Sequence, residues 1–314
     1  MSSPLKIDPA SLTIGIPCYN EALTIGKVVD DFRRVFPPAR ILVIDNESTD
    51  ETAKIAREHG AEVIAETRKG KGNAVQRLFR ETRSAYLIMV DGDDTYPAEE
   101  APKLIAVAEE MRSDTVVGCR VSNDAAAFKT AHTWANDFLS WLIETIFGAS
   151  CGDLFSGYRL FNKTFYRTVP LLSTGFEVET ELALQTIDKG YAQHEVGIDF
   201  RSRPEGSESK LHTFRDGFRV LRAILLIVKD FKPLLFFSTL SLFFLFCSLV
   251  VGIFPVLDYL RYRYIYHVPL AILATGLAVF FALSIVCGVI LDTIVRYTRE
   301  QALIRMRNME LPVK

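Results

Sequence analysis

Two long stretches of this chain contain no charged residue, and they limit its possible folds more than any other feature. They run from Leu234 to Leu257 and from Val268 to Leu291, and each holds 24 residues. As helix, at about 1.5 Å per residue, either stretch would be about 36 Å long, whereas the hydrocarbon core of a bilayer is about 30 Å thick. Buried helices of soluble proteins seldom stay uncharged over such a length. We therefore expect two membrane-spanning helices joined by a short hairpin.

Basic residues flank the two predicted spans unevenly. Arg215, Arg219, Arg222, Lys229 and Lys232 precede them, Arg296, Arg299, Arg305 and Arg307 follow them, and Arg261 and Arg263 lie between them. Because basic loops stay on the cytoplasmic side, we expect both termini and the large domain in the cytosol. Met1 to Lys6 holds no apolar core of a signal peptide. We expect an integral protein of a bacterial or archaeal plasma membrane rather than of the endoplasmic reticulum.

The segment from Leu211 to Lys232 has an amphipathic pattern. Its apolar residues recur at intervals of four and three, and its basic residues fall off that stripe, which consists of Phe214, Phe218, Leu221, Leu225 and Val228. A basic amphipathic helix is suited to lie on an anionic leaflet. We therefore expect a cytosolic domain over 1–210, an interfacial helix over 211–232, a transmembrane hairpin over 233–295 and a cytosolic tail over 296–314.

Strand and helix patterns alternate along the first third of the chain. Short apolar runs predict strands at 12–16, 41–44, 62–65, 85–90 and 115–118, and longer segments between them predict helices at 21–36, 48–59, 73–84 and 98–111. Continuous apolar strands separated by helices indicate a mainly parallel sheet covered on both faces. We expect a Rossmann-like α/β domain, in which ligands bind at the carboxyl ends of the strands.

The stretch Asp91-Gly92-Asp93-Asp94 directly follows one of these apolar strands. Carboxylates at the end of a buried strand are costly unless a cation meets them. A divalent metal that also carries substrate phosphates is the usual solution, and Mg²⁺ or Mn²⁺ suits such donors. We expect Asp93 to bind the metal, Asp91 to share it or to hold a ribose, and Asp94 to serve the turn.

Polar residues also follow the first two predicted strands. Asp45 and Asn46 follow the second strand, where the edge of a base would be read. At the end of the first strand, Pro17, Tyr19 and Glu21 are candidates for contact with the nucleoside. Ligands of such sheets bind across neighbouring strand ends, so we expect these residues to form one nucleotide site with the aspartates.

Several cations lie in the predicted loops around this site. Lys71 lies between two glycines that lead into a helix, where close backbone approach and the helix N-terminus favour phosphate. Other cations near predicted site loops are Arg120, Arg159, Arg203 and Lys210. A diphosphate leaving group and a phosphate acceptor need cations beyond the metal. As a set facing a membrane, these residues indicate an anionic lipid headgroup.

In combination, these stretches resemble glycosyltransferase family 2 enzymes with the GT-A fold. The matching residues are Ile16-Pro17-Cys18-Tyr19-Asn20-Glu21, Val43-Ile44-Asp45-Asn46-Glu47-Ser48-Thr49-Asp50, Gly70-Lys71-Gly72-Asn73-Ala74 and Asp91-Gly92-Asp93. More narrowly, the chain resembles polyprenyl-phosphate or dolichyl-phosphate hexose synthases. That likeness rests on Ser156-Gly157-Tyr158-Arg159, Gly175-Phe176-Glu177 and Arg203-Pro204-Glu205-Gly206-Ser207-Glu208-Ser209-Lys210-Leu211, and the two predicted spans support it.

The resemblance implies an inverting transfer of a hexose or N-acetylhexosamine from a nucleotide sugar to a membrane polyprenyl phosphate, with Mg²⁺ or Mn²⁺ as cofactor. UDP-sugars are favoured, and GDP-mannose is the other candidate donor. It implies that Asp45, Asn46 and Asp91 contact the nucleotide, that Asp93 binds metal, and that the lipid phosphate meets Arg120, Arg159, Arg203, Ser209 and Lys210. The expected catalytic residues are Asp93, Arg120, Arg159, Lys210 and Glu177.

One departure from the family pattern concerns the residues after the second strand. The family commonly has two aspartates and a glycine where this chain has Asp45-Asn46-Glu47. An asparagine both donates and accepts hydrogen bonds, whereas an ionised aspartate only accepts. The departure leaves the identity of the base open, whereas the expected fold is unaffected.

The chemistry of the acceptor separates the alternatives. A phosphate oxygen is already ionised near neutral pH, so it needs only positioning and charge neutralisation. A hydroxyl acceptor would need a general base. Glu177, Glu179 and Glu181 are candidates for that base, although their spacing also fits the start of a helix. We expect Glu177 to position the substrate or bind the sugar.

Two other functions compete with transfer to a lipid phosphate. A processive polysaccharide synthase would carry a QxxRW stretch, but neither Trp134 nor Trp141 follows an arginine. A non-catalytic membrane scaffold built on a decayed transferase would not need the retained aspartates and arginines.

The remaining composition excludes several classes of protein. No CxxC or CxxH pair occurs among Cys18, Cys119, Cys151, Cys247 and Cys287, so we expect neither a disulfide framework nor a zinc site. The net charge of −2 gives no sign of a nucleic-acid partner. The sugar and the oligomeric state, a homo-oligomer included, stay open.

Overall fold

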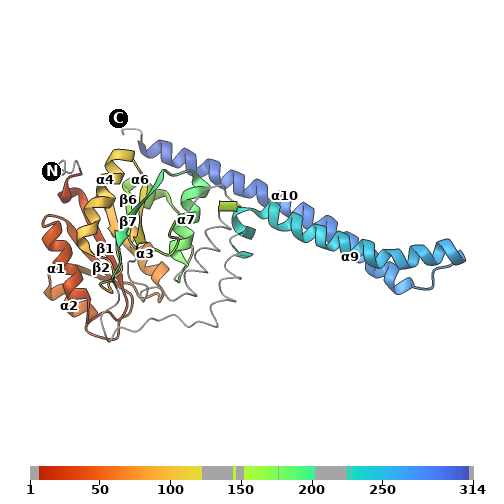
Figure 1. Cartoon of the computed structure of the whole chain (residues 1–314), viewed down its shortest axis with the longest axis horizontal. Coiled ribbons are helices and arrows are strands. Elements are labelled where there is room, and N and C mark those ends of the chain that lie inside the picture. Colours follow the sequence, from red (N-terminus) through yellow and green to blue (C-terminus); the bar gives the residue numbers. More distant parts are fainter. Residues whose placement is uncertain are drawn as a thin grey trace. The chain divides into compact units, whose positions relative to one another are not determined.

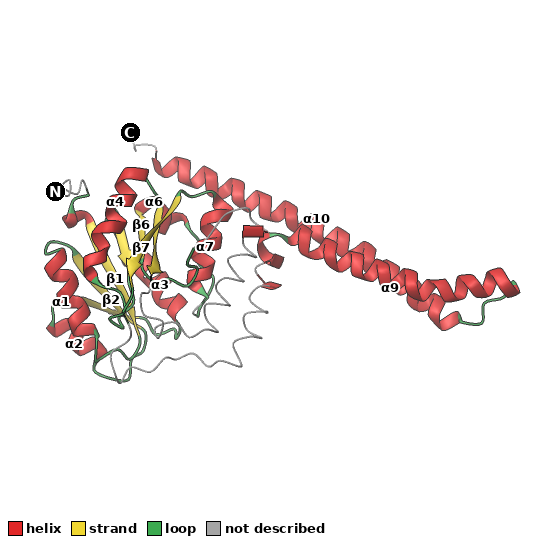
Figure 2. Cartoon of the chain, in the orientation of Figure 1, coloured by secondary structure: helices red, strands yellow, loops and turns green. Residues whose placement is uncertain are grey.

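The chain divides into two compact units. The computed structural model describes residues 7–121, 144–145, 152–175, 177–201, 225–226 and 228–310. One unit comprises Met1–Thr213 with Arg305–Lys314, and the other comprises Phe214–Ile304. The first holds a sheet with helices and the second consists of helices (Figures 1 and 2).

A seven-stranded sheet forms the centre of the first unit, in the order β3-β2-β1-β4-β6-β5-β7. Its strands are β1 (Leu12–Cys18), β2 (Arg40–Asp45), β3 (Glu62–Ala65), β4 (Tyr86–Met89), β5 (Thr115–Val121), β6 (Arg159–Asn162) and β7 (Gln193–Asp199). Strands β1 to β4 pair in parallel, as do β5 and β7. Strand β6 runs antiparallel to both β4 and β5. The sheet is therefore mixed, and the predicted parallel arrangement is confirmed for its first four strands.

Helices cover both faces of this sheet (Figure 2). They are α1 (Ile25–Val35), α2 (Thr52–Glu58), α3 (Lys71–Glu81), α4 (Ala101–Met111), α6 (Lys163–Thr168) and α7 (Val178–Lys189), with 3-10 turns at Pro9–Ser11 and Ala98–Glu100. Successive side chains of a strand point to opposite faces, and β2 shows the consequence. Ile41 and Val43 join a core that includes helices α1 and α4, whereas Leu42 and Ile44 join a second core that includes helices α3, α6 and α7. The predicted two-sided cover is confirmed.

The second unit consists mainly of two long apolar helices, α9 (Pro233–Tyr262) and α10 (Val268–Glu310), of which α10 belongs to this unit as far as Ile304. Each helix contains an 18-residue stretch with a mean hydropathy of 2.6, and only 11% of that stretch is buried. Both helices are long enough to cross a membrane. Ser248 Oγ donates to the carbonyl of Ala274, which ties the two helices together. The helical hairpin expected from the sequence is present, and α10 extends through most of the predicted tail. The predicted interfacial helix lies largely outside the described residues.

Candidate active site

The carboxyl ends of β1, β2 and β4 lie together and carry the predicted acidic residues. The proximity of these acidic residues affects the buried thiol of Cys18, which lies at the end of β1. Burial raises the pKa of Cys18 well above its usual value, and the negative charges of Glu21, Asp91, Asp45 and Asp93 raise it further. The charges of four carboxylates therefore act on one thiol, and we call this group of four residues the carboxylate edge. The strand ends meet at one edge because β1 pairs in parallel with both β2 and β4, and their use as one nucleotide site stays a prediction.

Asp45 is the member of the carboxylate edge with an unused acceptor. The residue is 9% exposed and pairs in the sheet with Cys18. Its Oδ1 atom is buried and accepts no hydrogen bond within the described part of the chain. A buried carboxylate oxygen without a donor is costly. The arrangement therefore suits a ligand that brings its own N–H or O–H donor.

The side chain of Asn46 forms hydrogen bonds with the backbone of the protein. Its Nδ2 donates to the carbonyls of Glu66 (3.1 Å) and Arg68 (2.8 Å), and its Oδ1 accepts from the backbone of Gly70 (2.6 Å). Donation to the edge of a base would break one of the two Nδ2 bonds, and only the second lone pair of Oδ1 remains for a base. The amide instead holds the loop before α3 in place, so the expected contact with a base does not follow from this geometry.

The residues after β1 differ in how they meet the carboxylate edge. Pro17 is buried within β1. Lys69 Nζ donates to the Tyr19 hydroxyl (3.1 Å) and lies 4.9 Å from the centre of its ring. The backbone N–H of Glu21 donates to Thr52 Oγ1 (2.8 Å). Tyr19 and Glu21 are therefore held near the edge, whereas Pro17 belongs to the sheet.

Asp93 and Asp94 have separate roles in the turn after β4. Asp93 is 4% exposed, and its Oδ1 accepts from the hydroxyl (2.6 Å) and the N–H (3.3 Å) of Thr95. Asp94 has a left-handed backbone, with φ of 58°, and pairs with Lys27 at 2.6 Å. The prediction that Asp94 serves the turn agrees with this geometry.

Lys71 connects the carboxylate edge to α7. Its Nζ lies 2.6 Å from Asp91 Oδ1 and 2.5 Å from Glu179 Oε1, and all three side chains are largely buried. Burial by itself lowers the pKa of Lys71, but the two carboxylates more than offset that effect, so the pKa lies above its usual value. Lys71 therefore stays protonated and holds the carboxylate of Asp91 in one orientation.

The glycines around Lys71 allow the chain to approach itself. Gly70 has φ of +125°, and a Cβ there would lie 2.1 Å from the carbonyl oxygen of Thr174. A Cβ at Gly72 would lie 2.1 Å from the carbonyl oxygen of Ser173, and the N–H of Gly72 donates to Thr174 and Gly175. The expectation that these glycines admit a phosphate is therefore not met in this structure. The segment before α7 occupies the N-terminus of α3 instead.

Arg120 is held by an aspartate that sequence reasoning missed. Its Nε and Nη2 atoms form a bidentate pair with Asp153 at 2.6 and 2.7 Å, and its guanidinium lies 5.4 Å from the ring centre of Phe200. Burial raises the pKa of nearby Tyr96 to about 12 despite the charge of Arg120, so the phenol stays neutral. The only signal for Asp153 was its place just before the Ser156-Gly157 motif.

Arg159 lies inside the protein rather than at a ligand surface. It is 1% exposed, its Nε donates to the carbonyl of Ser156 (3.0 Å), and its Nη2 donates to that of Leu154 (2.9 Å). This is a correction to the expected contact with a lipid phosphate, because β6 is inserted between β4 and β5 and buries its first residue. The neighbouring motif does reach the site, since a Cβ at Gly157 would lie 2.4 Å from Asp91 Oδ2.

The three glutamates at the start of α7 separate in space. Glu177 is exposed at the N-terminus of the helix. Glu179 pairs with Lys71, and Glu181 accepts the N–H groups of Leu172 and Ser173. The helix start that their spacing suggested is confirmed. The other expected phosphate contacts, Arg203, Ser209 and Lys210, lie outside the described residues.

The residues that could hold a divalent metal are Asp91 and Asp93. Within the described ranges, no group of three His, Cys, Asp or Glu side chains is arranged around one metal position. Two carboxylates with substrate phosphate oxygens form a donor set that suits Mg²⁺ or Mn²⁺. The concentration of negative charge at the carboxylate edge fits the same cation.

Three comparisons with known proteins agree with this geometry. The sequence pattern of glycosyl transferase family 2 matches residues 13–169. Glycosyltransferase AglJ of Haloferax volcanii is 32% identical over 300 residues, covering 93% of this chain and 96% of that protein. The dolichyl-phosphate hexose transferase of the same organism is 29% identical over 214 residues, covering 68% of this chain and 92% of that protein.

A solved structure shares the fold of the first unit. Glucosyl-3-phosphoglycerate synthase of Mycobacterium tuberculosis, in complex with Mn²⁺, UDP and phosphoglyceric acid, matches with a TM-score of 0.57 and 19% identity, over 69% of this chain and 77% of that one. The fold and the family match thus define a glycosyltransferase. This chain belongs to glycosyltransferase family 2.

Proposed function

We propose that this chain transfers a hexose or N-acetylhexosamine from a nucleotide sugar to a membrane polyprenyl phosphate, with inversion at the anomeric carbon. The observation that carries the donor half is the unsatisfied, buried Asp45 Oδ1 among the four carboxylates around Cys18. The acceptor half is supported by the two helices long enough to span a membrane and by the likeness to a dolichyl-phosphate hexose transferase.

In the donor half, Asp45 accepts a hydrogen bond from the base. Uracil and guanine both present a ring N–H, and the likeness to a synthase solved with UDP favours a UDP-sugar. Tyr19 and Glu21 are the neighbouring residues proposed to contact the nucleoside. Asn46 contributes indirectly, because it fixes the loop before α3.

Asp93 and Asp91 are proposed to hold the metal together with the diphosphate of the donor. When bound, Mg²⁺ or Mn²⁺ would neutralise charge on the diphosphate leaving group. Lys71 keeps Asp91 oriented through its bridge to Glu179. The protonated Lys71 also supplies a positive charge at the carboxylate edge, which favours departure of an anionic diphosphate.

In the acceptor half, the lipid phosphate attacks the anomeric carbon directly. Its oxygen is already ionised, so the reaction needs orientation and charge neutralisation rather than a general base. We propose Arg120, set by Asp153, as one cation for this phosphate, with Arg203, Ser209 and Lys210 as the others. We assign Arg159 to the support of the loop at Ser156, and Glu177 to positioning of the sugar.

The test measures nucleotide release by the full chain in nanodiscs, with UDP- or GDP-sugars and a short polyprenyl phosphate. Release should require both the lipid phosphate and a divalent metal, and Asp93→Asn should remove it. Asp45→Asn should raise the KM for the nucleotide sugar about tenfold or more, because a charged acceptor is lost, and leave the KM for the lipid unchanged. Asp94→Asn is the matched control and should change neither KM.

Two outcomes would replace the proposal. Equal rates with the corresponding polyprenol would assign a hydroxyl acceptor. Binding of nucleotide and metal without any lipid-dependent release would assign the non-catalytic scaffold.

A further inference from the structure

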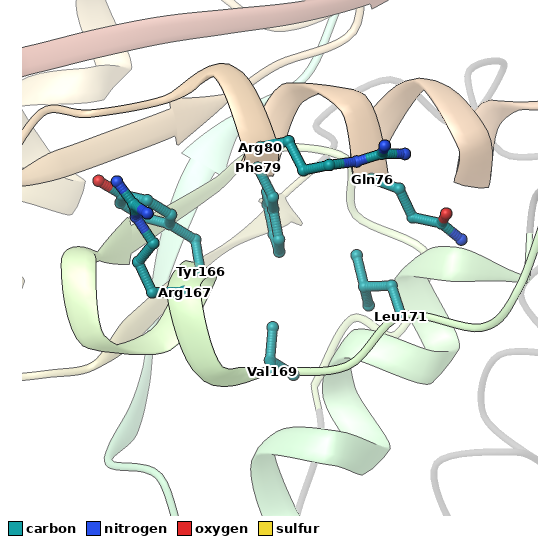
Figure 3. A pocket seen from close by; sticks show the side chains of 7 residues that line it. All are labelled: Gln76, Phe79, Arg80, Tyr166, Arg167, Val169 and Leu171. Atoms are coloured by element: carbon teal, nitrogen blue, oxygen red, sulfur yellow. The ribbon is translucent and has the colours of Figure 1, made fainter. Parts of the chain in front are cut away.

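A surface cavity of about 440 Å³ lies between α3, α6 and the segment that follows α6. It is lined by Gln76, Phe79, Arg80, Tyr166, Arg167, Val169 and Leu171. Figure 3 shows the apolar side chains directed into the space, with Arg80 and Arg167 on either side of it. Because α3 begins at Lys71, the cavity lies farther along that helix than the carboxylate edge, and no predicted site residue lines it.

Two arginines, Arg80 and Arg167, line this cavity, and two further cations lie on the same two segments of the chain. Arg80 lies in the last turn of α3, and Arg83 follows just beyond the end of that helix. Lys163 and Arg167 are four residues apart on α6. All four side chains are exposed. In the part of the chain that the structure describes, none of them forms an ion pair, and the nearby Glu81 is engaged by Arg77 at 3.0 Å. The cations therefore present unneutralised positive charge.

An exposed leucine directly follows Leu171, which lines the cavity. Leu172 is 79% exposed, in the loop Val169-Pro170-Leu171-Leu172-Ser173. Glu181 accepts the backbone N–H groups of Leu172 (2.9 Å) and Ser173 (2.8 Å), which holds the loop in this conformation. An exposed leucine in a loop that also lines a cavity with unpaired arginines is typical of a surface that enters the headgroup region of a membrane.

We propose that this α3–α6 face, defined by the cavity with Arg80 and Arg167, the neighbouring Arg83 and Lys163, and Leu172, binds anionic phospholipid headgroups of the membrane that carries the chain. Charge complementarity selects the partner, since the arginines pair with lipid phosphates, and Leu172 and the apolar floor meet the glycerol and upper acyl region. The same chain holds two helices long enough to span a bilayer, so an adjacent leaflet is available. The contact concerns the docking of the domain and is independent of which sugar is transferred.

The test measures amide hydrogen exchange of the full chain in nanodiscs. One set is made of phosphatidylcholine alone, and the other contains phosphatidylcholine with phosphatidylglycerol. Exchange in peptides over 163–173 should be at least about fivefold slower with phosphatidylglycerol, since even a single basic side chain at an anionic surface strengthens binding by about that factor. Raising the salt concentration should reduce the difference. Peptides over 25–58 serve as the internal control.

Charge reversals identify the residues responsible. Arg80→Glu with Arg167→Glu should abolish the lipid dependence, whereas Arg57→Glu with Arg112→Glu, at two exposed cations on other helix ends, should preserve it. Leu172→Ser should weaken the protection even if the double reversal fails to fold. The proposal is overturned if protection is equal in both lipids, if it depends on protein concentration as a second copy would require, or if inorganic phosphate reproduces it without phosphatidylglycerol.

Discussion

At the scale of single residues, backbone strain marks the ends of the strands that build the site. Asn20, Glu47 and Asp94 all have left-handed backbones, with φ of 54° to 58°. Asparagine and aspartate tolerate this region better than other residues that carry a Cβ, but Glu47 does not share that tolerance. Glu47 stands where family 2 commonly has a glycine, and its backbone conformation supplies the physical reason for that glycine.

Replacement of Glu47 by glycine should therefore stabilise the protein. The left-handed conformation costs a residue with a Cβ about 1 kcal/mol, and the Glu47 side chain is exposed. We expect Glu47→Gly to raise the free energy of unfolding by about 1 kcal/mol, measured by thermal unfolding in detergent. Glu51→Gly, at a residue with φ of −82°, is the matched control and should destabilise instead. A destabilised Glu47→Gly variant would show that the Glu47 side chain has an unrecognised role.

The sequence predicts which residues reach the site better than it predicts their partners. Asp45, Asp91 and Asp93 could be placed together because parallel strands end at one edge of a sheet. The partnerships Lys71–Glu179 and Arg120–Asp153 join segments far apart in the chain, and no local pattern encodes them. The burial of Arg159 was missed for a related reason, since it depends on the insertion of β6 between β4 and β5.

At the scale of elements, the apolar strands were predictable and the polar ones were not. Strands β1 and β2 are continuous apolar runs with almost every residue buried. Strand β6 has only two apolar residues between Arg159 and Asn162, and β7 is mostly exposed or half-buried, so neither presents the pattern of a buried strand. Helix α1 begins at Ile25 rather than at Glu21, because the backbone N–H groups of residues 20–22 donate to the side chains of Ser48, Asp50 and Thr52.

The packing of the Ser173–Gly175 segment against α3 gives a prediction for that helix. A Cβ at Gly72 would overlap the carbonyl oxygen of Ser173, and such overpacking costs about 1–3 kcal/mol. Gly72→Ala should therefore lower the free energy of unfolding by about 2 kcal/mol in thermal unfolding. Gly190→Asn is the control, because Gly190 has open space around it at φ of +71° and asparagine tolerates that region. Equal stability of both variants would contradict the close contact.

At the scale of the whole molecule, the distribution of basic residues predicts how the hairpin crosses the membrane. If both termini are cytosolic, a cysteine at Tyr264, between α9 and α10, should react with a membrane-impermeant maleimide on intact cells. A cysteine at Ser2 should react only after permeabilisation, and the unaltered chain should not be labelled from outside. Labelling at Ser2 in intact cells would reverse the proposed orientation.

The central claim is that the carboxylate edge and the spanning helices belong to one reaction, between a nucleotide sugar and a lipid phosphate. The most direct measurement is the mass of the lipid after incubation of the full chain with polyprenyl phosphate, a divalent metal and each of a set of UDP- and GDP-sugars. The account predicts that one donor adds the mass of a single sugar residue to the polyprenyl phosphate, and that Asp93→Asn abolishes the product. An unchanged lipid with every donor, or a sugar added to polyprenol as readily as to its phosphate, would contradict it.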